Sequence, residues 1–474
     1  MIAVSRSKVL KTGPNRPLSD RNRHIHTIAK TWSNNVDSEY TEKMVALARD
    51  FDYERDRHSF WVDPELSLLY GTPVWEQATH AQKLALNHLY WVGNYNHTAI
   101  SEASTSVYNL VTSGVFEKVG GYDTLCKELV FETEQESHHI RTFQKIGYKT
   151  KVSLLGKSWL RNPYYKHLKD LDKVSSQNSV TSLLWNTFSS DPFSNALEGV
   201  AGFMNRTRSH QYSSYLQDLA LQGKPLPTAS DGLGGRSAPR SVLKFFAANW
   251  GNSAFLAAQY YSIRYIANAI LKNQEFAYFK HYRKLSQKGE YIPTPTAISY
   301  YHLLDEAFHT TISQTVAKEL FTDFDKPTLY EKSVAGLSVY MWQRNLLSGL
   351  SGVLPGRCTA DDPMFMLFFY RLFRSTLFNM SAQEAFEWIE KCFCSEHDGY
   401  HTGLKYHASL LSSLQQLFGQ LAYQWPVNRD MRLMAAGASV EQSIQRNAQT
   451  FSNFKRCLTS EIAPSVTVGN GMAA

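Results

Sequence analysis

Apolar residues recur at three-to-four spacing over long stretches of this chain that contain no proline. The first such stretch, EQATHAQKLALNHLYWVGNYNHTAISEAS, begins near residue 75, and its period is that of an amphipathic α-helix. Gly120 and Gly121 interrupt the pattern, which then resumes in TLCKELVFETEQESHHIRTFQKI. Glycine pairs favour a turn between helices. We therefore predict a helical hairpin from these two segments.

A second hairpin is predicted over 251–320. A long helical pattern, SVLKFFAANWGNSAFLAAQYYSIRYIANAILKNQEFAYFKHYRKL, ends before KGEYIPTP, in which Gly289, Pro293 and Pro295 break the helix. A further helical segment follows and contains YYHLLDEAFHTT. Helical patterns also cover 363–374, 381–395 and 403–424, and we find no convincing strand. The predicted fold class is all-α.

Changes in composition along the 474 residues of the chain divide it into four segments. We expect a poorly ordered segment over 1–36, a helical domain over 37–345 with an enlarged crossover at 150–245, a helical extension over 346–460 packed on the core, and a flexible tail over 461–474. The loop GKPLPTASDGLGGRSAPR lies within the crossover.

Charge and cysteine content limit the class of protein. A formal net charge of +7 is modest, and the basic clusters are not interleaved with a nucleic-acid module, so no nucleic-acid partner is expected. No apolar run is long enough to cross a bilayer. The odd number of cysteines and the lack of CxxC spacing predict free thiols in a reducing compartment, and hence a cytoplasmic protein; the cysteines are Cys126, Cys358, Cys392, Cys394 and Cys457.

Each predicted hairpin carries a Glu-x-x-His pair. Glu136 and His139 stand in ETEQESHHIRTF, and Glu306 and His309 in YYHLLDEAFHTT. Residues at i and i+3 share one helix face and can reach one metal ion. Two such pairs on separate helices, with a Glu from each of two others, are typical of di-iron carboxylate bundles. His302 lies one turn before Glu306 on the same face, and a metal is one efficient partner for such a buried carboxylate.

The two remaining carboxylates come from the other helices. Glu102 is the only acidic residue between Glu76 and Glu117. Glu198 and Glu275 are both candidates for the third helix. Glu275 precedes Glu306 by 31 residues, close to the 34 that separate Glu102 from Glu136, so hairpin geometry favours Glu275.

At these residues the sequence resembles the p-aminobenzoate N-oxygenase family of di-iron oxygenases. The matching stretches are WVGNYNHTAISE, the GVF turn, EQESHH and EFAYFKHYRKLSQKGEYIPTPTAISYYHLLDEAFH, within about 60–147 and 250–330. The resemblance implies a ferritin-like four-helix bundle with additional helices, and a homodimer. It implies that two iron ions are held by Glu102, Glu136, His139, Glu275, His302, Glu306 and His309. Asp305 is expected to orient a ligand imidazole.

The resemblance implies an O2-dependent oxidoreductase that forms a peroxo-type diferric intermediate. The implied reaction is monooxygenation of a small amine to a hydroxylamine or nitro compound in natural-product biosynthesis. It needs an external electron donor, a reductase or a ferredoxin-like carrier, because the sequence has no flavin or nicotinamide fingerprint. The crossover and the C-terminal extension are longer than the family needs, which leaves the substrate open.

Two alternatives stay open on the sequence. A di-iron oxygenase that hydroxylates, desaturates or cleaves carbon would use the same ligands, and product analysis separates it. A non-catalytic metal-binding helical protein would lose nothing measurable when Glu306 is replaced. Glu132 could be a ligand-supporting residue or a solvated or ion-paired one, and Glu396, His397 and His401 are interpreted as surface residues.

Overall fold

The computed structural model describes residues 18–161, 213–226, 240–347, 349–350 and 363–462. Within these ranges every regular element is a helix and no strand occurs, which confirms the all-α prediction. Cys126, Cys392 and Cys394 carry free thiols. No helix in the described ranges is long and apolar enough to span a membrane.

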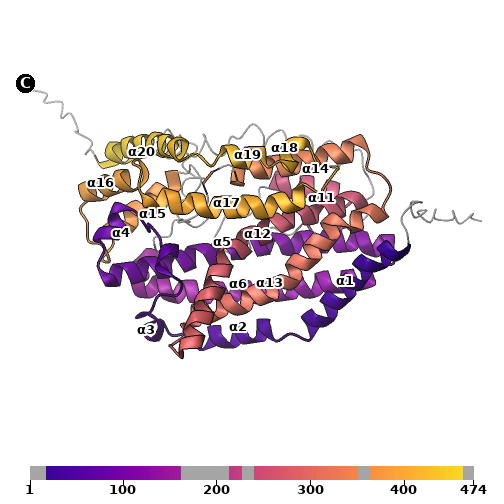
Figure 1. The fold of residues 1–474 in the computed structure, drawn as a ribbon, viewed down its shortest axis with the longest axis horizontal. Helices are drawn as coiled ribbons and strands as arrows, with labels where there is room; N and C mark the ends of the chain where they lie inside the picture. Colours follow the sequence, from indigo (N-terminus) through magenta and orange to yellow (C-terminus); the bar gives the residue numbers. More distant parts are fainter. Residues whose placement is uncertain (1–17, 162–212, 227–239, 348, 351–362, 463–474) are drawn as a thin grey trace, which may run out of the picture.

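Four helices form the centre of the molecule (Figure 1). They are α5 (His80–Val119), α6 (Asp123–Arg161), α12 (Ala254–Lys288) and α13 (Thr294–Lys318). α5 packs on α6 and α12 on α13 as antiparallel hairpins, and further contacts join α5 to α12 and α6 to α13. Both predicted hairpins are therefore present in one bundle.

Local signals set the ends of these helices. A capping box between Thr79 and Gln82 begins α5, where the side chains satisfy backbone groups that the first turn leaves unpaired. Ser253 caps α12 through the N–H of Leu256. α12 ends at Gly289, whose φ of 66° lies in the left-handed region that glycine adopts without steric cost.

The predicted helix before Gly289 is in fact two helices. α11 (Arg240–Trp250) ends at Gly251, and α12 begins at Ala254. A Cβ on Gly251 would lie 2.5 Å from the carbonyl oxygen of Ala247 and 2.4 Å from Leu216 Cδ1. The sequence hides this break because apolar residues continue on both sides of it.

The N-terminal prediction is wrong for 18–36. This segment forms α1 (Leu18–Val36), which packs with α2 (Tyr40–Arg49) against α6 and α13. His24 is fully buried and its Nε2 lies 2.8 Å from Asp323 Oδ2. The inward face of α1 includes polar residues as well as Ile28, so it lacks the apolar period that would have indicated a packed helix. Residues 1–17 lie outside the described ranges.

The remaining helices cover the bundle. The α-helices among them are α3 (Tyr53–Asp56), α4 (Pro73–Gln77), α10 (Ser214–Leu221), α14 (Leu329–Trp342), α15 (Pro363–Arg374), α16 (Ala382–Phe393), α17 (Asp398–Phe418), α18 (Pro426–Arg429), α19 (Arg432–Ala436) and α20 (Val440–Ile462). The chain also forms two short 3-10 helices, η1 (Pro64–Leu66) and η2 (Leu320–Asp323), and a short π-helix, η3 (Gln343–Leu347). α17 contacts α12, so this part of the C-terminal extension packs on the bundle (Figure 1). Most of the crossover, with Glu198, lies outside the described ranges.

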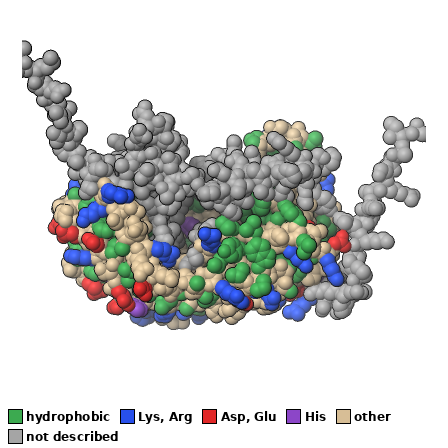
Figure 2. Space-filling model, turned by 90° about the horizontal axis from the view of Figure 1, so that it is seen from above, with side chains coloured by type: hydrophobic (Ala, Val, Ile, Leu, Met, Phe, Trp, Pro, Cys, Tyr) green, Lys and Arg blue, Asp and Glu red, His purple; other side chains and the backbone are tan. Residues whose placement is uncertain are grey.

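Two apolar clusters lie along the bundle with a polar band between them. On α13, Ile298 belongs to one cluster and Ile312 to the other, and the polar residues of the band lie between them. α6 repeats this order, with Leu129 in one cluster and Phe143 in the other. On the face of the molecule seen in Figure 2, positive and negative side chains are interspersed around hydrophobic ones. The polar band is a concentration of ionisable groups inside the molecule.

Candidate metal centre

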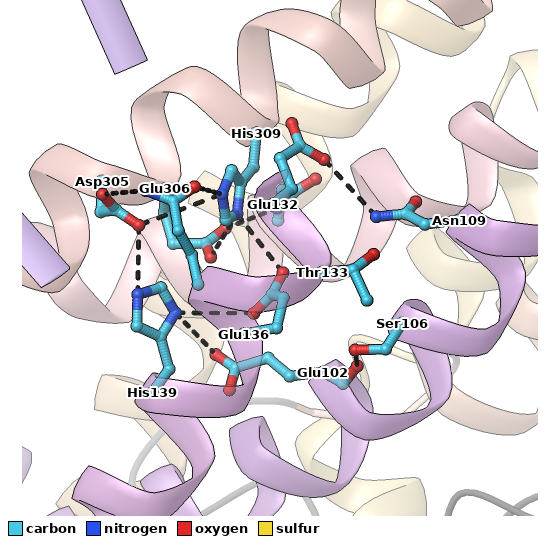
Figure 3. Close-up of polar contacts among 12 residues, drawn as sticks. Glu102, Ser106, Asn109, Glu132, Thr133, Glu136, His139, Asp305, Glu306 and His309 are labelled. Carbon is cyan, nitrogen blue, oxygen red and sulfur yellow. Dashed lines mark hydrogen bonds and ion pairs between the residues drawn. The ribbon is translucent and has the colours of Figure 1, made fainter. Parts of the chain in front are cut away.

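The polar band contains all seven residues predicted as ligands. Each of them is at most 5% exposed. α5 contributes Glu102, α6 contributes Glu136 and His139, and α12 contributes Glu275; His302, Glu306 and His309 come from α13. Figure 3 shows Glu102, Glu136 and Glu306 pointing toward the rings of His139 and His309. Burial of so many ionisable groups is costly unless each has a partner or a metal.

Two groups of side chains could each hold a metal ion. One consists of Glu102, His139, His302 and Glu306, and the other of Glu136, Glu306 and His309. In each group, one candidate atom per residue lies within 4.8 Å of all the others. Glu306 belongs to both groups. A carboxylate in that position can bridge two ions.

The distances support close convergence. His302 Nε2 lies 3.1 Å from Glu102 Oε1, and His309 Nδ1 lies 2.8 Å from Glu306 Oε1. His309 Nδ1 is also 3.3 Å from Glu136 Oε1. His139 Nδ1 lies 3.5 Å from Glu136 Oε2. The two Glu-x-x-His pairs therefore face one another across the bundle, as their spacing predicted.

Glu275 takes a different place from the other predicted ligands. Its Oε1 lies 2.6 Å from His302 Nδ1 and accepts a hydrogen bond of 2.5 Å from the Tyr95 hydroxyl. It is fully buried but belongs to neither group. Its role as an iron ligand stays a prediction.

Asp305 and Gln135 connect the two Glu-x-x-His imidazoles. Asp305 Oδ2 is 3.1 Å from His139 Nε2, and Gln135 Nε2 donates to Asp305 Oδ1 at 3.1 Å. Gln135 Oε1 is 3.3 Å from His309 Nε2. Asn35 of α1 donates to the same Gln135 oxygen at 3.1 Å. Such partners orient metal-binding imidazoles, and α1 is part of that support.

A second set of contacts lies behind the carboxylates. Asn268 donates to Glu306 Oε2 at 2.9 Å. Arg264 Nη1 donates to Glu132 Oε2 at 2.5 Å, and Arg264 Nη2 lies 3.6 Å from Glu136 Oε1. Glu132 is fully buried and ion-paired with Arg264, which agrees with the ion-paired alternative and is at odds with the solvated one.

Several of these supporting residues are not predicted by the sequence. Arg264 had a usable signal, because it is the only charged residue between Lys244 and Lys272, and a charge within such an apolar helix needs a buried partner. Asn35, Gln135 and Asn268 had none, since amides occur on helices of every kind. Of the three residues interpreted as surface, Glu396 and His401 form an exposed pair, whereas His397 is half-buried and its Nε2 lies 2.6 Å from the carbonyl oxygen of Cys392.

The surroundings of the buried carboxylates and imidazoles shift their pKa values in different directions. Burial and the nearby charge of Glu136 raise the pKa of Glu102 to about 7. Burial alone would lower the pKa of His139, but its contacts with Asp305 and Glu136 raise it to about 9. Burial opposes ionisation of Glu136, yet hydrogen bonds from His139 and His309 keep the pKa of Glu136 low. Without metal, protons on the imidazoles therefore stabilise the carboxylates.

Several polar atoms of the band have no hydrogen-bond partner. These buried atoms are Glu102 Oε2, Glu136 Oε2, His139 Nδ1 and Glu275 Oε2. Buried acceptors are nearly always paired in folded proteins. Oxygen-rich donor sets with imidazoles suit iron or manganese, whereas structural zinc favours thiolates. The residues present thus fit a pair of such ions.

One comparison with known proteins gives a match. A family model described as "Acyl halogenase CylC-like" matches residues 23–455, which is most of the chain. Neither the comparison with curated proteins nor that with solved structures gives a match. This match agrees with one part of the resemblance, namely that the chain is a relative of di-iron-type enzymes. It does not extend to N-oxygenation. The chain belongs to the family of CylC-like acyl halogenases.

Proposed function

We propose that this enzyme replaces a C–H bond of an acyl substrate by a carbon–halogen bond, using O2 at a pair of iron ions. The observation that carries the proposal is the position of Glu306 in both metal-competent groups, in a chain of an acyl halogenase family. The residues that would hold the ions are Glu102, Glu136, His139, Glu275, His302, Glu306 and His309. When bound, the ions would supply O2 activation and the oxidising power to break the C–H bond.

The reaction balances with an external reductant. One C–H bond, one halide ion, one O2, two electrons and three protons give one carbon–halogen bond and two waters. The electrons would come from a reductase or a ferredoxin-like carrier.

The chain's own residues would position the ligands and exclude water. Asp305 and Gln135 hold the His139 and His309 rings through Nε2, which leaves the Nδ1 atoms facing the carboxylates. Asn268 fixes one oxygen of Glu306. The apolar clusters on both sides of the band keep bulk water from the site, so that the charges act in a medium of low polarity.

The test compares carbon and nitrogen as the oxidised atom. Protein loaded anaerobically with ferrous iron would be mixed with O2, a reductant, bromide and either an acyl thioester or p-aminobenzoate. We expect a monobrominated acyl product, seen by mass spectrometry through the bromine isotope pattern. A nitro or hydroxylamine product without any brominated acyl product would contradict the proposal and restore the N-oxygenase interpretation.

Two variants serve as controls for that assay. Glu306→Ala should lose both iron and product, because both groups lose a member. Glu396→Gln alters an exposed pair with His401 and should keep the wild-type iron content. Iron lost in both variants would point to a general folding defect.

A further inference from the structure

A cavity of about 110 Å³ lies between α5 and α12 beside the metal-competent groups. Glu102, Glu136 and Glu306 form part of its wall. The rest of the wall is mostly small or apolar, with Thr98, Ser101, Thr105, Ala267, Ile270 and Leu271 among its residues. The cavity is therefore the place where substrates could approach the ions.

Arg264 is the only lysine or arginine among the residues that line this cavity. It is 3% exposed, and its guanidinium group is only partly used by the protein. Nη1 donates to Glu132, but Nη2 is 3.6 Å from Glu136 Oε1, beyond a good hydrogen bond. Neither Nη2 nor Nε has a hydrogen-bond partner. A buried cation with unpaired N–H groups is ready to bind an anion.

The charge of the metal ions decides whether an anion can enter. Without metal, the three wall carboxylates would repel it. Two divalent ions carry four positive charges, which balance the four glutamates predicted as ligands, and any electrostatic argument must include them. At the Arg264 end the Glu132 carboxylate is already paired with Nη1, the Glu136 carboxylate would be balanced by the ions, and Thr105 adds a hydroxyl group to the wall. The Nε and Nη2 groups of Arg264 are then the donors left for a halide ion.

We propose that the Arg264 end of this cavity is the halide-binding site of the enzyme. The N–H groups at Nε and Nη2 would hold chloride or bromide between α12 and the metal-competent groups. This proposal rests on the proposed function, because halogenation is the reaction that needs the ion. It adds the position of the halide, which the family match does not give.

The test measures halide binding directly, without turnover. Protein loaded anaerobically with ferrous iron would be crystallised with bromide, and the bromide located by anomalous scattering. The line width of the chlorine NMR signal would give the affinity in solution. We expect one bromide beside Arg264 Nε and Nη2. Bromide found only elsewhere on the molecule would overturn the proposal.

The variant is chosen to preserve the fold. Arg264→Gln alone would leave Glu132 as an uncompensated buried charge, so the variant is the pair Arg264→Gln and Glu132→Gln, which removes both charges and keeps hydrogen-bonding side chains. Loss of a charge-assisted contact should weaken halide binding about tenfold or more. Unchanged affinity in this double variant would also overturn the proposal.

A matched control removes a nearby positive charge that does not line the cavity. Lys272 is on α12 and its charge is felt by Glu306 and Glu275, but it is absent from the cavity wall. Lys272→Gln should keep halide affinity within about twofold. The iron content of each crystal is determined in parallel. Two irons without bromide beside Arg264 would overturn the halide site and leave the metal centre of the proposed function standing, whereas a protein that takes up no iron would contradict the proposed function itself.

Discussion

Glu306 is the residue on which both metal-competent groups depend. Glu306→Gln keeps the volume of the side chain and the hydrogen bond to Asn268, but removes the charge that metal ions require. We expect fewer than two irons per chain after anaerobic loading, measured by atomic absorption with protein quantified by amino-acid analysis. Two tightly held irons in this variant would exclude a bridging role for Glu306.

Asp305 contacts an imidazole of one metal-competent group without belonging to either group. Asp305→Asn weakens its contact with His139 Nε2 and should lower metal affinity about 10- to 100-fold, as measured for other supporting carboxylates. Competition with a chelator of known affinity measures the change. An affinity equal to that of the wild type would show that the Asp305 charge does not act on the metal through His139.

The residues of the two metal-competent groups could be predicted because their chemistry and spacing are local. Glu-x-x-His is visible in any helix, and Glu102 was the only acidic residue of its segment. The similar hairpin lengths, 34 and 31 residues, favoured Glu275, whose role as a ligand stays a prediction. The supporting residues could not be predicted in the same way. Asn35 reaches Gln135 from a position 100 residues away, and no local pattern records such a contact.

At the scale of elements, the break between α11 and α12 gives a direct test of packing. Gly251→Ala should destabilise the fold by about 1–3 kcal/mol, because the new methyl group would meet the Ala247 carbonyl oxygen and Leu216. Gly147→Ala is the matched control. Its Cβ would contact only Val92 Cγ1 at 3.4 Å, and alanine favours the helix.

Urea unfolding of both glycine variants measures the difference in free energy. Gly147→Ala should be as stable as the wild type or slightly more stable. If the two substitutions had equal effects, the close approach of α10 to the α11–α12 break would not be real.

The hairpins were predictable because apolar periodicity and glycine or proline breaks lie in the sequence itself. α1 was not predictable for a physical reason: it packs with a polar face. His24, Thr31 and Asn35 are buried at helical spacing, and their partners belong to segments far along the chain. A helix whose buried face is polar resembles a solvated segment when only the sequence is known.

For the whole molecule, acid stability should depend on His88. This ring is fully buried, stacks on Trp61 and contacts the Tyr53 hydroxyl. Burial lowers the pKa of His88 to about 4, against about 6.5 in the unfolded chain. Between these values the unfolded state binds the additional proton, so the free energy of unfolding falls as the pH drops from about 7 to 4.

The expected loss from this one group is about 3 kcal/mol. Urea unfolding at several pH values would measure it for the wild type and for His88→Gln. The substitution should lower stability at neutral pH but reduce the slope below pH 6.5. Parallel curves for the two proteins would show that His88 does not take part in the acid response.

The polar band between the two apolar clusters has a consequence for how the molecule unfolds. In the metal-free protein the band is held together by ion pairs and hydrogen bonds, which should join the two clusters less tightly than metal ions would, so the metal-free protein should melt in two calorimetric transitions, one for each cluster. Bound ions stabilise only the folded state and tie the four central helices together. With iron the transitions should merge at a higher temperature. The resistance of this protein to heat would then report how much iron is available to it.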